Sequence, residues 1–147
     1  MQHIGEGTLA IPDDWHNATV NIYTAQPPGT RGTNITVNRD LLPFGTTLAD
    51  YVSAQGSNLK EQLPQYKLLN EGTVSLGEDT AHMLEFTWLS QDAGEVHQLL
   101  MTIANGSAVL NFAGTSNGKM SDSQRQQILD VLKSFRLNSP ASPLPAV

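Results

Sequence analysis

The residues of this chain that could do chemistry are few and widely spaced. Gly114 to Lys119 reads GTSNGK and resembles a phosphate-binding loop. That motif requires four residues between its glycines and a hydroxyl residue directly after its lysine, which helps to hold Mg²⁺. Here three residues separate Gly114 from Gly118, and Met120 follows Lys119. A plain connection between a strand and a helix is therefore favoured.

The four histidines are the other candidates, either as metal ligands or in proton transfer. None of them, His3, His16, His82 or His97, stands three or four residues from another, the spacing that places two ligands on one helix face. His82 and His97 fall on neighbouring predicted strands and could face each other, although a solvated or structural role is favoured. No serine stands in a Gly-x-Ser-x-Gly motif. The chain has no cysteine, so thiolate nucleophiles, disulfides and sulfur-ligated metals are excluded.

The densest cluster of reactive side chains is the run from Asp13 to His16, which also contains Asp14 and Trp15. It follows Pro12 directly, and we interpret it as a turn in which Trp15 covers the end of the sheet. With no nucleophile–base pair and no metal-ligand spacing elsewhere, the sequence predicts no enzyme, no cofactor and no metal site.

Composition excludes further partners. The 147 residues carry a net charge of -6, and no basic run appears anywhere. Nucleic acids and anionic membranes both require clustered cations, so neither is expected as a partner. No window approaches 18 consecutive apolar residues, the length of a membrane-spanning helix. The first residues lack the basic and apolar stretches of a signal peptide, so we expect a cytoplasmic protein that is not integral to a membrane.

The pattern of the chain predicts an α+β fold. Strands are expected over residues 8–11, 18–25 and 34–42, followed by a helix near 47–63 with Thr47 and Asp50 at its start. Four strands follow at 66–76, 81–91, 95–105 and 107–115, with a hairpin turn at Asn105-Gly106. A closing helix near 121–135 begins with the capping box Ser121–Gln124. We therefore predict a twisted, mostly antiparallel sheet of six or seven strands with two main helices. Residues 1–138 form one domain, and the Pro/Ser-rich residues 139–147 form a flexible tail.

Alternate residues of the last three strands fall into two sets. One set is dense enough in large apolar side chains to form the core beneath the two helices: Leu84, Phe86, Trp88, Leu99, Met101, Ile103, Leu110 and Phe112. The other set mixes aliphatic and hydrogen-bonding side chains: Met83, Glu85, Thr87, Leu89, Gln98, Leu100, Thr102, Val109 and Asn111. A wetted face of an antiparallel sheet should be strongly polar. Either this second face is open and receives an apolar ligand, or loops or the first helix cover it.

Two segments carry a resemblance to a known family. Residues 6–15, EGTLAIPDDW, and residues 34–40, NITVNRD, resemble DcrB-related proteins of the PsbP/Mog-like fold. Within that group, the single domain without an export sequence is most similar to the Eag chaperones of bacterial type VI secretion. The resemblance covers residues 1 to about 138. It implies a homodimer that holds the N-terminal transmembrane segments of an effector in a concave sheet surface before export.

Strand parity then gives the residues that we expect to contact the effector. They are Ile22, Ile35, Val37, Met83, Thr87, Leu89, Gln98, Leu100, Thr102, Val109 and Asn111. The alternative is a Mog- or PsbP-like module that binds a soluble protein. DcrB-like lipoproteins and photosynthetic PsbP proteins share the fold, but they carry export sequences.

Overall fold

The structure is a computed structural model that describes residues 1–27 and 32–138. The predicted tail, residues 139–147, lies outside the described residues. In chain order the elements are β1 (Gln2–His3), β2 (Thr8–Leu9), β3 (Asn21–Thr24), β4 (Asn34–Leu41), α1 (Leu48–Gln62), β5 (Lys67–Leu76), β6 (Asp79–Ser90), β7 (Gly94–Asn105), β8 (Ala108–Asn117) and α2 (Asp122–Lys133).

Six of these strands form one sheet in the order β3-β4-β8-β7-β6-β5, and every neighbouring pair is antiparallel. The last four strands follow one another through short turns. At the Asn105-Gly106 turn, Gly106 has a φ of 63°, a backbone conformation that favours glycine. The α+β class and the antiparallel six-stranded sheet are confirmed.

The segment before β3 departs from the prediction. Only Thr8 and Leu9 of the expected first strand are extended, and β2 pairs with β1 in a separate two-stranded sheet. The turn at Asp13-Asp14 is confirmed, since the Trp15 N–H donates to the Pro12 carbonyl at 3.0 Å. The expectation that Trp15 covers the sheet end is wrong, because its side chain is 64% exposed.

Both helices begin as their sequences predict. The Thr47 hydroxyl accepts a hydrogen bond from the Asp50 N–H at 3.1 Å at the start of α1. At the start of α2, the Ser121 hydroxyl accepts from the Gln124 N–H, and the Gln124 side chain accepts from the Ser121 N–H. These bonds satisfy N–H groups that no residue of the helix itself can reach.

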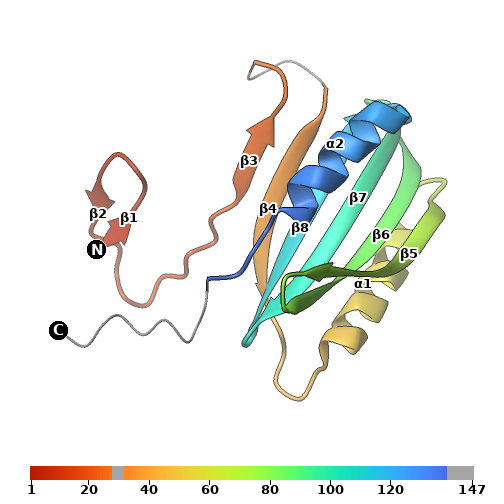
Figure 1. Cartoon of the computed structure of the whole chain (residues 1–147). Coiled ribbons are helices and arrows are strands. Elements are labelled where there is room, and N and C mark those ends of the chain that lie inside the picture. The colour runs from red at the N-terminus through yellow and green to blue at the C-terminus, as the bar shows by residue number, and fades with distance from the viewer. Residues whose placement is uncertain (28–31, 139–147) are drawn as a thin grey trace.

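The two helices lie on opposite faces of the sheet, so the prediction of one core beneath both is wrong (Figure 1). The error lies in β6. Residues that pair across an antiparallel sheet point to the same side, and Leu84 pairs with Leu100 rather than with a neighbour of Leu100. Leu84, Phe86 and Trp88 therefore face α1, while Leu99, Met101, Ile103, Leu110 and Phe112 face α2.

The larger core lies between α2 and the sheet. Ile128, Leu129 and Leu132 of α2 are buried, and α2 approaches so closely that a Cβ at Gly114 would overlap the Ile128 side chain. Phe135 is partly buried and packs against Phe112, with the two rings tilted and their centroids 4.7 Å apart. Under α1 the apolar cluster is smaller, with Leu84, Phe86 and Leu100 buried against Leu59 and Leu63.

Candidate functional site

The eleven residues predicted to contact a partner do not share one face. Ile22, Gln98, Leu100, Thr102, Val109 and Asn111 face α1, whereas Ile35, Val37, Met83, Thr87 and Leu89 face α2. The single predicted surface is therefore wrong in its composition. Its β7–β8 part stays together, since Thr102 pairs directly with Asn111.

One row of residues crosses the α1 face from the β3 edge to β6. It runs Ile22, Thr36, Ala113, Leu100 and Leu84, each paired with the next. Ile22 is 63% exposed at one end, whereas Leu100 and Leu84 are only 9% and 5% exposed. The burial shows that α1 covers β6 and β7 and leaves β3 and β4 open. Of the two alternatives left by the sequence, cover by the first helix is correct for the centre of this face.

The dimensions of the sheet give the same result. Six strands about 4.8 Å apart span roughly 24 Å, whereas a helix with its side chains is about 10 Å wide. A single helix therefore covers less than half of this face. The open part has room for one more helix alongside α1.

A chain of uncharged hydrogen bonds fixes α1 to the sheet. Asn111 accepts from Gln55 at 3.0 Å and from Thr102 at 2.8 Å, and its amide donates to the Tyr51 hydroxyl at 2.9 Å. Tyr51 in turn donates to the Asp40 carboxylate at 3.0 Å. Burial chiefly raises the pKa of Tyr51, and the adjacent Asp40 raises it further. Asn111 and Thr102, predicted to bind a partner, thus hold this chain's own helix.

Gln98 is engaged in the same way. Its carbonyl accepts from the Trp88 indole at 2.8 Å, and its amide donates to the Thr115 hydroxyl at 2.9 Å. Gln98 is nevertheless only partly buried, and each of its polar atoms retains bonding capacity. It lies where the covered part of the face meets the open part.

We define the α1 shelf as the open part of this face together with the flank of α1 beside it. Its floor is made of Ile22, Thr36, Asn38 and Ala113. Along the α1 flank runs a depression of about 230 Å³, lined by Asp40, Tyr51, Ala54, Gln55, Asn58, Leu59 and Gln62. Among the described residues named for this shelf, Asp40 alone is charged. The surface combines exposed aliphatic groups with amides and hydroxyls, which suits an apolar segment that also carries small polar groups.

Comparison with known proteins gives a family match and a similar sequence. A family model for DcrB matches residues 6–134. The chain belongs to the DcrB family. It is also similar to the Pseudomonas aeruginosa protein named Effector EagT6, with 29% identity over 89 residues. The match covers 60% of this chain and 62% of that relative, which is less than two thirds of its length. The predicted resemblance to Eag-type, DcrB-related proteins is confirmed.

Two solved structures share the fold of this DcrB-family chain. A Pseudomonas aeruginosa protein of unknown function, PA94, superposes with a TM-score of 0.77 at 22% identity, over 94% of this chain and 96% of its own. The PsbP protein of the cyanobacterium Synechocystis superposes with a TM-score of 0.56 at 16% identity, over 90% and 100% of the two chains. The predicted PsbP-like fold is therefore confirmed.

Sequence reasoning missed a buried ionic cluster on the α2 face of this DcrB-family domain. Glu85 is 2% exposed and accepts two hydrogen bonds of 2.8 Å from Arg125 of α2. Asn70 also donates to Glu85 at 2.8 Å, and His97 Nε2 lies 2.8 Å from its second oxygen. The Arg125 hydrogen bonds lower the pKa of Glu85 to about 2, against the opposing effect of burial. Nothing in the sequence indicated this pair, because Arg125 stands 40 residues from Glu85 in the chain.

The remaining chemical candidates have structural places. His97 Nδ1 accepts from the Met120 N–H at 2.9 Å, so the ring proton lies on Nε2 and is donated to Glu85. His82 pairs with Thr102 on the opposite face, so the two histidines do not meet. Residues 114–117 form the end of β8, and only Gly118 and Lys119 of this run lie in the connection to α2, so the expected loop is mostly strand. Across residues 1–27 and 32–138, no group of three or more His, Asp or Glu side chains could hold a metal ion. No helix in those ranges is long and apolar enough to cross a membrane.

Proposed function

We propose that this protein is a cytoplasmic chaperone that binds a type VI secretion effector and shields its N-terminal transmembrane helices before export. The proposal includes a homodimer without enzymatic activity. The similarity to the protein named Effector EagT6 supports an effector-associated role. The observation that carries the proposal is the α1 shelf, which has the width of one helix and an exposed aliphatic side chain, Ile22, on its floor.

The shelf fits such a helix physically. A membrane-spanning segment of about 20 apolar residues aggregates if it is left in water. Burial of its apolar surface is worth roughly 25 cal/mol per Å², from which the costs of association must be subtracted. A helix beside α1 would pack at about 8–10 Å from it, as helices generally do. Its backbone polar groups are already satisfied internally, so only small polar side chains need partners.

Gln55, Asn58 and Gln98 are placed to provide those partners. Gln55 and Gln98 are partly buried at the border of the shelf, and Asn58 is exposed on the α1 flank. Uncharged groups can meet an apolar helix without the desolvation cost of a buried ion. In this proposal Leu100, Thr102, Val109 and Asn111 act beneath the surface, because they form the packed floor on which α1 rests.

The test uses two neighbouring residues of β3. Ile22 and Tyr23 are each 63% exposed, but they point to opposite faces of the same strand. We expect Ile22→Asp to weaken binding of an effector's N-terminal transmembrane peptide at least a hundredfold, because the new carboxylate would be desolvated without a partner. Tyr23→Asp is the matched control and should leave the affinity nearly unchanged. Binding is measured by fluorescence anisotropy with a labelled peptide, and folding by thermal melts.

Three results contradict the proposal. If Tyr23→Asp abolishes binding and Ile22→Asp does not, the helix binds on the α2 face instead. If neither variant nor the parent binds the peptide, the chaperone function itself is wrong. If the parent binds only a folded soluble domain of the effector, the alternative of a PsbP- or Mog-like module applies. Leu100 and Val109 are unsuitable for this test, because they are 9% and 0% exposed and a charge there would unfold the domain.

A further inference from the structure

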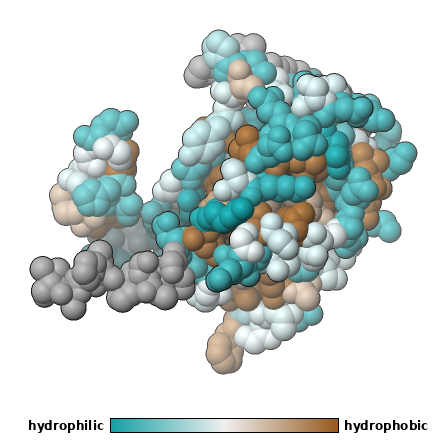
Figure 2. All heavy atoms as spheres, in the orientation of Figure 1, coloured by the Kyte–Doolittle hydropathy of each residue, from teal (hydrophilic) through white to brown (hydrophobic). Residues whose placement is uncertain are grey.

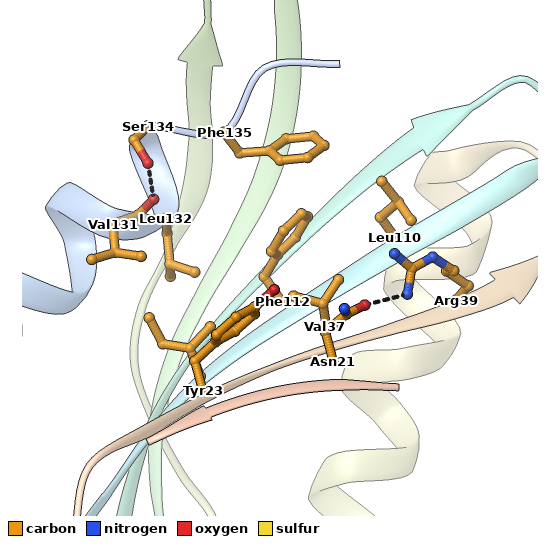
Figure 3. A pocket seen from close by; sticks show the side chains of 11 residues that line it. Asn21, Tyr23, Val37, Arg39, Leu110, Phe112, Val131, Leu132, Ser134 and Phe135 are labelled. Atoms are coloured by element: carbon orange, nitrogen blue, oxygen red, sulfur yellow. Dashed lines mark hydrogen bonds between the residues drawn. The ribbon is translucent and has the colours of Figure 1, made fainter. Parts of the chain in front are cut away.

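A second apolar surface lies on the opposite face, between α2 and the β3–β4 end of the sheet. It is a groove of about 330 Å³ whose lining includes Tyr23, Ile35, Val37, Phe112, Val131 and Phe135. Figure 3 shows side chains from the sheet and from α2 around one space, among them the aromatic rings of Phe112, Phe135 and Tyr23. In Figure 2, apolar atoms gather beside the polar outer surface of α2. We call this surface the α2 groove.

The groove is open because α2 is too narrow to cover its whole face of the sheet. One helix leaves part of a six-stranded sheet uncovered here as well, since Tyr23 of β3 is exposed and Ile35 and Val37 of β4 are only partly buried against the α2 core. Tyr23 and Val131 are 63% and 49% exposed although both belong to regular elements. A contiguous exposed apolar surface of this kind marks a site of interaction.

The chain also has an N-terminal segment with several exposed apolar side chains. Residues 1–18, which we call the N-terminal arm, extend away from the sheet (Figure 1). Among the described elements, the substantial contacts of β1 and β2 are with each other. Ile4, Leu9 and Trp15 of the arm are 55%, 47% and 64% exposed. A two-stranded hairpin is at best marginally stable alone in water, so this arm is expected to gain order from a surface that it contacts.

Hydrogen bonds at the base of the arm direct the arm away from its own domain. Arg39 Nη1 donates to the Asn21 side chain at 2.8 Å and to the Thr19 carbonyl at 3.3 Å. These bonds fix the chain where it enters β3, and the arm continues outward from that point rather than over the α2 groove of the same molecule (Figure 1). A second copy is therefore the partner whose groove the arm can reach without releasing these bonds.

Charge and shape agree with that partner. Trp15 follows two carboxylates, Asp13 and Asp14, and Arg39 lines the α2 groove. The Arg39 guanidinium has donors beyond those used at the base of the arm, so it can meet the acidic turn while the indole enters the aromatic-lined space. Tryptophan is the residue most often found to dominate a protein interface.

We infer that the N-terminal arm of one copy docks into the α2 groove of a second copy, with Trp15 as its anchor. A two-fold axis makes the exchange reciprocal and closed, so both grooves are filled. The arm and the α1 shelf use opposite faces of the sheet, so the exchanged dimer keeps the shelf open. The inference rests on the homodimer of the proposed function and deepens it by naming the contact that forms that dimer.

Because the chain has no cysteine, a thiol crosslinker reacts only with the cysteines that are introduced. One chain carries His16→Cys, next to the anchor, and a differently tagged chain carries Ser134→Cys, at the rim of the α2 groove. With a short bis-maleimide, we expect a heterodimeric product between the two tags. Gln62→Cys, exposed on α1, replaces Ser134→Cys as the control and should give little product. Both variants are used as full chains, mixed without any effector.

Analytical ultracentrifugation gives the second measurement. Trp15→Ala should raise the dissociation constant of the dimer roughly thirtyfold, the effect of losing an interface anchor worth about 2 kcal/mol. Phe44→Ala is the control, since Phe44 is also an exposed aromatic residue but lies in the loop before α1. A yield of heterodimeric product no higher than that of the Gln62→Cys control overturns the exchange. So does a dimer that is indifferent to Trp15→Ala, or a monomer at every concentration. None of these results affects the peptide experiment with Ile22→Asp.

Discussion

The two helices cover opposite faces of one sheet, but they are held there by different chemistry. α2 rests on the larger apolar core and adds an ion pair between the partly exposed Arg125 and the buried Glu85. α1 rests on a smaller apolar cluster and on uncharged hydrogen bonds centred on Asn111. Amide and hydroxyl bonds contribute about 1 kcal/mol each, because water offers equivalent partners, whereas loss of one member of a buried ion pair costs several kcal/mol.

The way each helix is held affects how easily its face of the sheet can rearrange. A helix held by an apolar core and a buried charge is an integral part of the fold. A helix held by a smaller apolar cluster and a few uncharged hydrogen bonds opens locally at a lower free energy. The α1 side therefore suits a surface that accepts and releases a helix, and the α2 side suits a lasting contact such as a dimer interface.

The sharpest test compares one leucine from each helix. Leu132 of α2 is 1% exposed, while Leu59 of α1 is only partly buried. We expect Leu132→Ala to lower the free energy of unfolding by about 3 kcal/mol or more, through lost burial and the cavity that remains. Leu59→Ala should cost about 1 kcal/mol, because less of its side chain is removed from water. Urea unfolding measures both values, and equal losses would show that the two helices are held alike.

Acid should weaken the α2 side first. The pKa of Glu85 is about 2 in the folded state and ordinarily 4.5, so the unfolded chain takes up the proton at the higher pH. The stabilisation is fully present above about pH 4.5 and is lost as the pH falls towards 2, with a total of roughly 3 kcal/mol.

Urea unfolding between pH 6 and pH 2.5 provides the measurement, with Glu85→Gln as the control. The amide does not titrate, so this variant should lose less stability over the same range. Parallel pH profiles for the two proteins would show that the Arg125–Glu85 pair does not distinguish the faces.

A smaller effect is expected for the hydrogen bonds under α1. Gln55→Ala removes the bond to Asn111, which keeps its bonds to Tyr51 and Thr102, so the domain should lose only about 1 kcal/mol. Amide hydrogen exchange should accelerate in α1 and stay unchanged in α2. Gln62→Ala, exposed at the end of α1, serves as the control. Equal acceleration in both helices would contradict the view that the two faces are stabilised separately.

Local patterns predicted the local structure well. Ser121 and Gln124 form the capping box that their spacing indicates, and the Asn105-Gly106 pair makes the expected turn. These features depend on residues only a few positions apart, so the sequence contains all the information that they need. The antiparallel order of β5 to β8 follows from the same short turns.

The assignment of strands to faces failed where the pattern was ambiguous. Met83, Leu84, Glu85 and Phe86 of β6 are all buried, so alternation along that strand cannot distinguish its two sides. Shifting a strand by one residue exchanges its faces, and only the pairing of Leu84 with Leu100 fixes the register. Five predicted contact residues therefore lie on the α2 face instead. They belong to β4 (Ile35 and Val37) and to β6 (Met83, Thr87 and Leu89).

The sequence by itself determined the elements, their caps and turns, the antiparallel sheet and the family, because each depends on local spacing or on recognisable segments. Only the tertiary structure decided which helix covers which face, where Glu85 finds Arg125, and which half of each face stays open. Those properties depend on contacts between residues far apart in the chain. The local sequence around a glutamate does not show whether its side chain is buried. That depends on whether folding brings a charged or hydrogen-bonding partner to the carboxylate.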